Sequence, residues 1–287
     1  PLCDVDGRPL QPGERVTWSV CVSCGACDRC RSGLPQKCRK LVKYGHSLAQ
    51  GREALSGGMA EFVLLRAGTS VVRLDGACHD DLVCPASCST ATVAAAIRAG
   101  RSVQNRRVLI LGAGLLGLTA AAFAKTAGAS RVIVCDLDAD RLRRAPEFGA
   151  DGTLQWQPDV DALRRQLATD LETDAFDCLF DFSGSPDAIE TALKLADLAA
   201  CIVLVGSVME SRPVSVDPQR VVRNWIRIHG VHNYAPEDLQ TAVGFLAEHG
   251  TRFPFTDTIQ RTFALRDIND AVNFAIQNRP IRIAIRP

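Results

Sequence analysis

The pattern of apolar and polar positions changes near residue 104. Residues 108–114, VLILGAG, form a continuous apolar run that predicts a buried strand. The segment 115–128, LLGLTAAAFAKTAG, combines small and apolar residues that favour a helix, and 131–138, RVIVCDLD, predicts a second buried strand. A strand, a helix and a strand in succession indicate a parallel βαβ unit.

The same alternation continues to about residue 250. Strand, helix, strand, strand and helix are expected in that order over 175–184, 185–198, 201–207, 226–231 and 236–250. Strands that alternate with helices imply a mostly parallel sheet covered on both faces. The expected fold class is therefore α/β, with a doubly wound parallel sheet of Rossmann type.

Residues 1 to about 75 show a different pattern, in which short β-like stretches are separated by segments rich in Gly, Cys and charge. ERVTWSV (14–20) and MAEFVLL (59–65) predict strands. The tail 263–287 predicts a helix opened by Asp267 and a closing strand, which we expect to return to the first domain. The expected organisation is a first domain over 1–103 with a cysteine-rich lobe at 21–40, a second domain over 104–250, and a return to the first over 251–287.

Length and charge narrow the classes of function. A chain of 287 residues suits two domains or one large α/β domain. Its 33 basic and 32 acidic residues give a net charge of +1, so the basic surface of a nucleic-acid-binding protein is not expected. No apolar run approaches the roughly 18 to 20 residues of a membrane span, and the N-terminus lacks the pattern of a secretory signal. We expect a cytoplasmic protein with neither a nucleic-acid nor a membrane partner.

A glycine motif follows the first buried strand of the second domain. It opens the next helix and comprises Gly112, Gly114, Leu115, Leu116 and Gly117. Asp136 ends the following strand, near the spacing of an acid that binds an adenosine ribose. The glycines let a pyrophosphate approach the helix N-terminus, and a carboxylate repels a 2′-phosphate, so NAD is favoured over NADP. The alternative is a tight turn whose glycines serve packing alone.

A cysteine cluster stands out from the first domain. Its spacing, CxxCxxC and then a fourth cysteine after seven residues, comprises Cys24, Cys27, Cys30 and Cys38. Four thiolates can form a closed structural zinc site, and metal ligation would supply folding free energy to a segment with almost no apolar residues. Nearby basic residues, Arg39 and Lys40 among them, should lower the thiol pKa values. An iron–sulfur cluster, disulfides and idle thiols are the alternatives, and Cys21 is expected to be a core thiol.

These motifs together resemble the zinc-containing medium-chain alcohol dehydrogenases, in the same order and at similar spacing over essentially the whole chain. The segments that carry the resemblance are CGACDRCRSGLPQKC (24–38), GGMAEF (57–62), CSTATVAAAI (88–97), GAGLLG (112–117) with Asp136, and FALRDINDAV (263–272). The combination with WSV (18–20) and YGH (44–46) looks most like a subgroup of alcohol dehydrogenases linked to phosphonate catabolism.

The resemblance implies a GroES-like β-rich catalytic domain, incomplete at its N-terminus, beside the Rossmann domain. It also implies hydride transfer between an alcohol carbon and the nicotinamide, with a second zinc as Lewis acid. Cys88 matches the family's cysteine ligand of that zinc, and Thr92 matches the position that packs near the nicotinamide. Arg141 matches a cationic residue at the adenosine ribose, and Arg282 matches a basic residue that reaches the cofactor phosphates.

The sequence departs from the family at the other catalytic zinc ligands, which in the family lie upstream of the segment where this chain begins. One cysteine cannot hold a catalytic zinc, because such sites use three protein ligands and an open position. His46 and Glu61 are the nearest substitutes, although a hydrogen-bonded domain residue is the favoured interpretation of each.

Three functional hypotheses remain open. The first is an NAD-dependent zinc alcohol dehydrogenase that acts on a small-molecule alcohol or carbonyl compound. The second is an NAD-binding protein with one structural zinc and no catalysis, and the third is a zinc-independent reductase. The resemblance also implies a homodimer or homotetramer.

Overall fold

The structure of the protein is a computed structural model that describes residues 2–46, 51, 55–74, 76 and 78–287. It divides into two compact units: the chain up to Ala91 together with Asn233–Pro287, and Thr92–His232. The divisions between the units thus follow Ala91 and His232, whereas the boundaries expected from the sequence were at 104 and 250. The helix α9 (Pro236–His249) belongs to the first unit. Tyr234, just before it, donates to the Ser87 carbonyl and accepts from the Val20 N–H.

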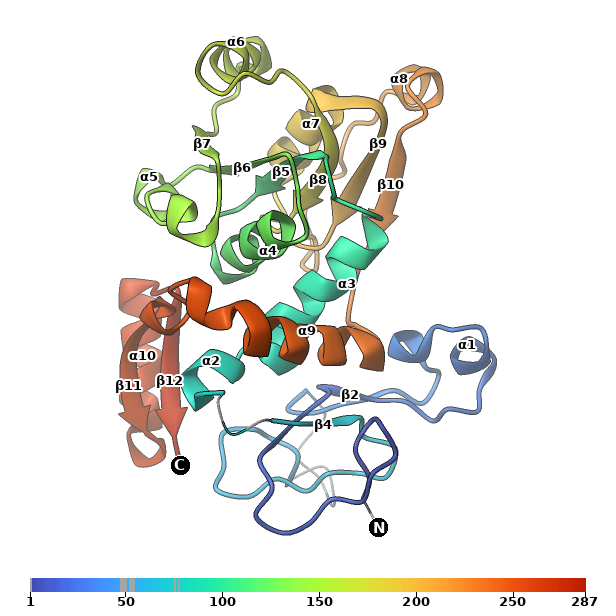
Figure 1. Cartoon of the computed structure of the whole chain (residues 1–287), viewed down its shortest axis with the longest axis vertical. Helices are drawn as coiled ribbons and strands as arrows, with labels where there is room; N and C mark the ends of the chain where they lie inside the picture. The colour runs from blue at the N-terminus through green and yellow to red at the C-terminus, as the bar shows by residue number, and fades with distance from the viewer. Residues whose placement is uncertain (1, 47–50, 52–54, 75, 77) are drawn as a thin grey trace. The chain divides into compact units, whose positions relative to one another are not determined.

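The second unit is built on one six-stranded sheet (Figure 1). Its strands are β5 (Arg107–Leu111), β6 (Arg131–Asp136), β7 (Gly152–Gln155), β8 (Phe176–Asp181), β9 (Ala196–Leu204) and β10 (Arg227–Gly230). They lie in the order β10-β9-β8-β5-β6-β7, and every pairing is parallel. This is the strand order of a dinucleotide-binding fold, with its reversal point between β5 and β8. The predicted α/β Rossmann sheet is confirmed.

Helices cover the faces of this sheet because its strands carry apolar residues on both sides. The helices are α3 (Ala91–Ala99), α4 (Leu115–Thr126), α5 (Ala139–Leu142), α6 (Val160–Asp170), α7 (Pro186–Leu195) and α8 (Pro218–Arg223). The core side chains Leu109, Ile133 and Leu179 have no exposed surface. Side-chain caps begin several helices; Ser185, for example, accepts from the Ala188 N–H at α7.

The first unit contains smaller sheets. Antiparallel pairs join β1 (Val16–Trp18) to β4 (Val71–Arg73) and β2 (Cys21–Val22) to β3 (Val42–Lys43). In the tail, the predicted helix and closing strand are confirmed as α10 (Ile268–Asn278) and β12 (Arg282–Arg286). The strand β11 (Ile259–Ala264), which was not predicted, pairs with β12 in parallel. The strand predicted at MAEFVLL is wrong, because residues 59–65 form no strand. Its Phe62 is 86% exposed, so this apolar alternation has no sheet to pack on.

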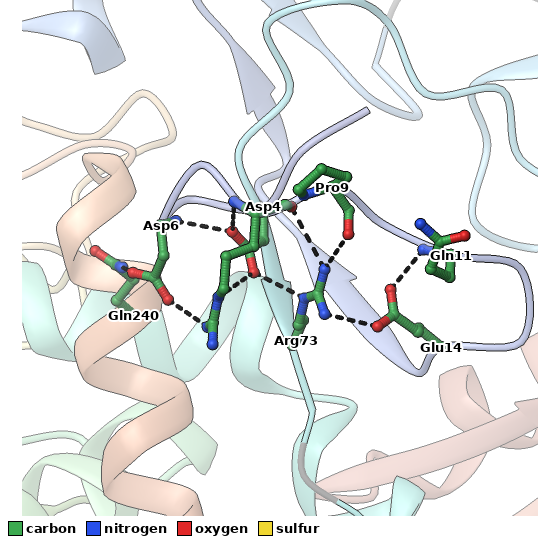
Figure 2. Close-up of polar contacts among 8 residues, drawn as sticks. Asp4, Asp6, Pro9, Gln11, Glu14, Arg73 and Gln240 are labelled. Atoms are coloured by element: carbon green, nitrogen blue, oxygen red, sulfur yellow. Dashed lines mark hydrogen bonds and ion pairs between the residues drawn. The ribbon is translucent and has the colours of Figure 1, made fainter. Parts of the chain in front are cut away.

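A buried carboxylate holds the start of the chain to β4 (Figure 2). The side chain of Asp4 is 1% exposed and accepts from the Arg8 N–H at 2.8 Å, and Arg73 Nε lies 2.7 Å from it. Gln240 of α9 donates to Asp6 at 3.3 Å. A buried charge is stable only when it is paired and hydrogen-bonded, and this carboxylate meets both conditions.

The expectation that no segment is long and apolar enough to cross a membrane is contradicted by one helical stretch, Asp80–Ala99. However, 61% of its most apolar part is buried inside the protein. The stretch comprises α2 (Asp80–Val83), a π-helical turn at Ala86–Thr90, and α3. A mostly buried apolar helix is typical of the core of a globular protein, so this is weak evidence for a membrane span.

Candidate functional site

The glycine turn lies at the carboxyl end of β5, and two of its three glycines occupy positions that a larger residue could not adopt. Gly112 has φ +104°, and a Cβ there would lie 3.2 Å from the Ser183 nitrogen. A Cβ on Gly117 would lie 1.7 Å from the Gly112 oxygen, which no side chain permits. Gly114, which caps α4, faces open space with nothing within 4 Å. The turn is therefore closely packed on its inner side and open where a ligand would approach.

Asp136 lies beside this turn at the end of β6. Its carboxylate accepts from the Ala113 N–H at 2.6 Å and from the Asp138 N–H at 2.9 Å. A hollow of about 120 Å³ adjoins it, lined among others by Gly112, Asp136, Leu137, Trp156, Ser183 and Asp187. The structure thus brings the predicted glycines and the predicted acid together at one opening. This is the position at which open α/β sheets bind ligands.

Sequence reasoning missed the loop that closes the other side of this opening. Asp181, fully buried at the end of β8, accepts from the Ser183 N–H at 3.0 Å, the Ser183 hydroxyl at 2.6 Å and the Gly184 N–H at 3.1 Å. Burial raises the pKa of Asp181, and these hydrogen bonds oppose that rise. The carboxylate holds the loop against Gly112. An acid that ends a buried strand at the sheet's reversal point was the signal that could have found it.

The remaining predicted cofactor residues lie in both units. Leu115 and Leu116 are half-buried in the first turn of α4. Arg141 lies in α5 with its Nε 3.8 Å from an Asp138 oxygen, and Thr92 is half-buried in α3. Arg282, in β12 of the first unit, donates to the Cys84 sulfur at 3.0 Å. Their roles toward a cofactor stay predictions.

The four-cysteine cluster forms one compact group in the first unit. The Sγ atoms of Cys24, Cys27, Cys30 and Cys38 all lie within 4.8 Å of one another. Cys27 Sγ is 3.5 Å from Cys30 Sγ and 3.9 Å from Cys38 Sγ. A tetrahedral zinc with Zn–S bonds of about 2.3 Å places its sulfurs about 3.8 Å apart. The spacing fits zinc, and it exceeds the S–S bond of about 2 Å in a disulfide.

Backbone groups act on the thiols of this cluster. The N–H groups of Arg39 and Cys30 lower the pKa of Cys27 to about 6. Burial, and then hydrogen bonds with Cys27 and Cys38, raises the pKa of Cys30 to about 12. The predicted influence of the basic side chains is therefore not the main one, since Arg39 pairs with Asp28 at 2.7 Å. Thiols this close cannot all ionise without a cation between them.

Cys88 and the two nearest substitutes for the other catalytic ligands, His46 and Glu61, form no comparable group. Cys88 is exposed in the turn before α3, and His46 and Glu61 are also exposed. His46 Nδ1 lies 3.0 Å from the Tyr44 carbonyl oxygen. Among the residues that the structure describes, the four-cysteine cluster is the only group of three or more potential ligand atoms. The role of Cys88 as a zinc ligand stays a prediction.

Comparisons with known proteins cover both units. Residues 116–248 match the family model described as zinc-binding dehydrogenase, and residues 4–76 match the alcohol dehydrogenase GroES-like domain. A Mycobacterium tuberculosis protein named "Probable alcohol dehydrogenase adh" is 31% identical over 275 residues, covering 91% of this chain and 72% of that protein. An L-threonine 3-dehydrogenase of Anaeromyxobacter dehalogenans is 26% identical over 280 residues, covering 96% and 75%.

Solved structures agree on the fold. The crystal structure of an alcohol dehydrogenase from Thermotoga maritima superposes with a TM-score of 0.92 at 23% identity, covering 99% of this chain and 79% of that chain. At this identity the likeness shows the fold alone, a GroES-like domain with a Rossmann sheet. Together with the two family models and the 31% identical relative, it leads to one assignment. The chain belongs to the zinc-binding medium-chain alcohol dehydrogenase family of oxidoreductases.

Proposed function

We propose that the protein binds NAD and transfers a hydride between a small alcohol or carbonyl compound and the nicotinamide. The observation that carries the proposal is the opening at the carboxyl edge of the sheet, where the glycine turn and Asp136 meet. Family membership supports the reaction class.

The chemistry of the opening supports NAD as the cofactor. Open space at Gly114 and the start of the twelve-residue helix α4 suit a pyrophosphate, since a helix N-terminus presents unpaired N–H groups and partial positive charge. The Asp136 carboxylate suits ribose hydroxyls and disfavours an added 2′-phosphate. Leu137, 67% exposed beside it, offers no positive charge to such a phosphate.

The geometry of the cysteine lobe is consistent with one structural zinc. Four sulfurs at tetrahedral spacing leave no open coordination position, so a bound ion would contribute to folding and not to chemistry. Cys24 and Lys40 donate backbone N–H groups to Cys38 Sγ at 3.2 and 3.3 Å, which orients this thiolate toward the cluster. Such hydrogen bonds are the usual support of a metal-ligating group.

A more specific proposal is a catalytic zinc bound by Cys88. The described residues do not supply the other ligands that such a site needs. No second and third ligand atom lie with Cys88 in a group that could hold a metal, within the described part of the chain. No chemical step is therefore derived through this ion. The second candidate function is NAD binding with one structural zinc and no alcohol chemistry. Substrate identity and a dimeric or tetrameric state stay proposals.

Metal analysis and cofactor titration on the same sample test these functions. We expect one zinc per chain, NAD binding that is tighter than NADP binding, and loss of NAD binding in Gly114→Val without loss of zinc. Alcohol-dependent NAD reduction together with a second zinc that Cys88→Ser removes would establish the catalytic zinc. Reduction with one zinc would favour a zinc-independent mechanism, and equal affinity for NAD and NADP would contradict the role given to Asp136.

A further inference from the structure

A second hollow, of about 280 Å³, lies at the edge of the six-stranded sheet opposite to the glycine turn. Its lining residues lie near the starts of β5, β8 and β10, whereas the glycine turn follows the end of β5. Its lining includes Arg101, Arg106, Cys178, Cys201, Trp225 and Arg227. None of these residues serves the proposed dinucleotide site.

The charge of this hollow is positive and unbalanced. Arg101, Arg106 and Arg227 form no ion pair with any described residue. One carboxylate, Asp177, also lines the hollow and lies within the electrostatic influence of Arg106. Arg107 pairs with Asp177 at 2.9 Å and also with Asp197, so the three other arginines leave an excess of positive charge. Three guanidinium groups around one concave surface attract an anion, because the field of like charges adds where solvent is partly excluded.

An aromatic ring accompanies the positive charge. Trp225 is 70% exposed, and the Arg227 guanidinium carbon lies 5.9 Å from its ring centroid. A large ring held at the surface beside a cation presents a flat apolar face next to an anion-binding group. This combination suits a ligand that carries both a planar ring and a negative charge.

The backbone around the hollow is held in an uncommon conformation. Arg101, Ala199 and Trp225 have φ values of +68°, +59° and +53°, in the left-handed region that residues other than glycine rarely adopt. The Ala199 N–H donates to the carbonyl of Asn224 at 2.7 Å. Because Asn224 directly precedes Trp225, this hydrogen bond links the backbone at Ala199 to the backbone at Trp225. Strained residues of this kind cluster at functional sites, where the surrounding structure maintains them.

The floor of the hollow is neutral. Cys178 and Cys201 pair across β8 and β9, and each donates its S–H to a carbonyl at the end of α3, Ala99 or Gly100. Burial raises the pKa of Cys178 to about 12 and also raises that of Cys201. Protonated thiols add no negative charge, so the floor does not oppose an anion.

We propose that this hollow is a second ligand site, which binds a small organic phosphate bearing a planar ring. The phosphate lies among Arg101, Arg106 and Arg227, and the ring packs against Trp225. Ligand pockets commonly have volumes of about 300 to 1,000 Å³. A hollow of about 280 Å³, near the lower end of this range, has the size to hold a small phosphate ester.

Calorimetric titration with two probes tests the site. Phenyl phosphate offers charge and a ring, and methyl phosphate offers the same charge without the ring. We expect phenyl phosphate to bind more tightly, and Arg227→Gln to weaken both probes about tenfold, the size of one lost charged hydrogen bond. Trp225→Asn should abolish the difference between the probes, because asparagine tolerates the left-handed backbone and has no ring.

Arg223→Gln is the matched control, because it removes the same charge from an exposed residue at the end of α8, outside the hollow. The proposal is overturned if Arg223→Gln weakens binding as much as Arg227→Gln, or if neither probe binds. It is also overturned if saturating NAD displaces phenyl phosphate, since the probe would then occupy the glycine turn. If thermal unfolding shows that Arg227→Gln does not fold, Arg106→Gln replaces it with the same expected outcome.

Discussion

The cysteine lobe and the six-stranded sheet solve the problem of stability in opposite ways. In the sheet, whole strands are buried, and Leu109, Ile133 and Leu179 have no exposed surface. In the lobe, neither α1 (Asp28–Arg31) nor the short turn Pro35–Lys37 buries a single residue. The sheet unit is held by many buried apolar side chains, each of which contributes about 1.5 to 3 kcal/mol. We propose that the lobe depends on one metal site, because metal ligation can supply about 10 kcal/mol or more.

The two regions should therefore respond differently to the loss of a single side chain. Loss of one apolar side chain removes a small share of the sheet's stability, because many neighbours remain. If the lobe is held by zinc as proposed, loss of one thiolate should remove most of its stability, because four ligands act as a unit.

Removal of one ligand should give the largest effect. We expect Cys38→Ser to abolish zinc binding and unfold the lobe, because three thiolates and a weakly coordinating hydroxyl no longer make a closed site. Zinc content and limited proteolysis within residues 21–40 are the measurements. Cys21→Ser is the control, since Cys21 is buried nearby but lies outside the cluster. A lobe that resists proteolysis in Cys38→Ser after the zinc is lost would show that the lobe is not metal-dependent.

The next prediction concerns the closely packed side of the glycine turn. Gly117→Ala places a Cβ 1.7 Å from the Gly112 oxygen, so we expect a loss of about 3 kcal/mol in the free energy of unfolding, together with loss of NAD binding. Gly114→Ala has open space and should weaken NAD binding with little change in stability. Chemical denaturation and cofactor titration separate the two. Equal stability losses would contradict the assigned geometry.

A smaller effect is expected at the acid of the same opening. Asp136→Asn removes the negative charge while it keeps the shape, and it should weaken NAD binding about tenfold while it improves the relative affinity for NADP. The comparison of both cofactors by titration is the measurement. Asp140→Asn, an exposed residue of α5 paired with Arg143, should change neither affinity. An unchanged preference in Asp136→Asn would move cofactor selection to another residue.

The smallest effect concerns pH and the surface of the sheet unit. The Arg212 side chain, and then the Ser215 N–H, lowers the pKa of Glu190 to about 2. Because the folded pKa lies below the unfolded value, the stabilisation is present above about pH 4.5 and is lost as the pH falls toward 2. Glu190→Gln should flatten this acid-induced decline in unfolding experiments. Glu147→Gln, an exposed residue of the same unit, should leave the decline unchanged.

Local patterns in the sequence predicted the features that depend on neighbouring residues. The buried runs of β5, β6 and β8 and the helices α4 and α7 were found because hydrophobic periodicity reports burial directly. The α6 helix and β7 went unnoticed, since their segments are more polar. MAEFVLL failed as a strand because strand-like alternation does not by itself provide a partner strand.

Two sites could be predicted from the sequence because their residues are close together in the chain. The glycine turn and the four-cysteine cluster are each specified within thirty residues, so their geometry follows from local chain constraints. Which residues from distant parts of the sequence lie together could be seen only in the tertiary structure. The Asp181 loop against Gly112 and the arginines around Trp225 come together through parallel strands, whose adjacency in the sheet does not follow their order in the chain.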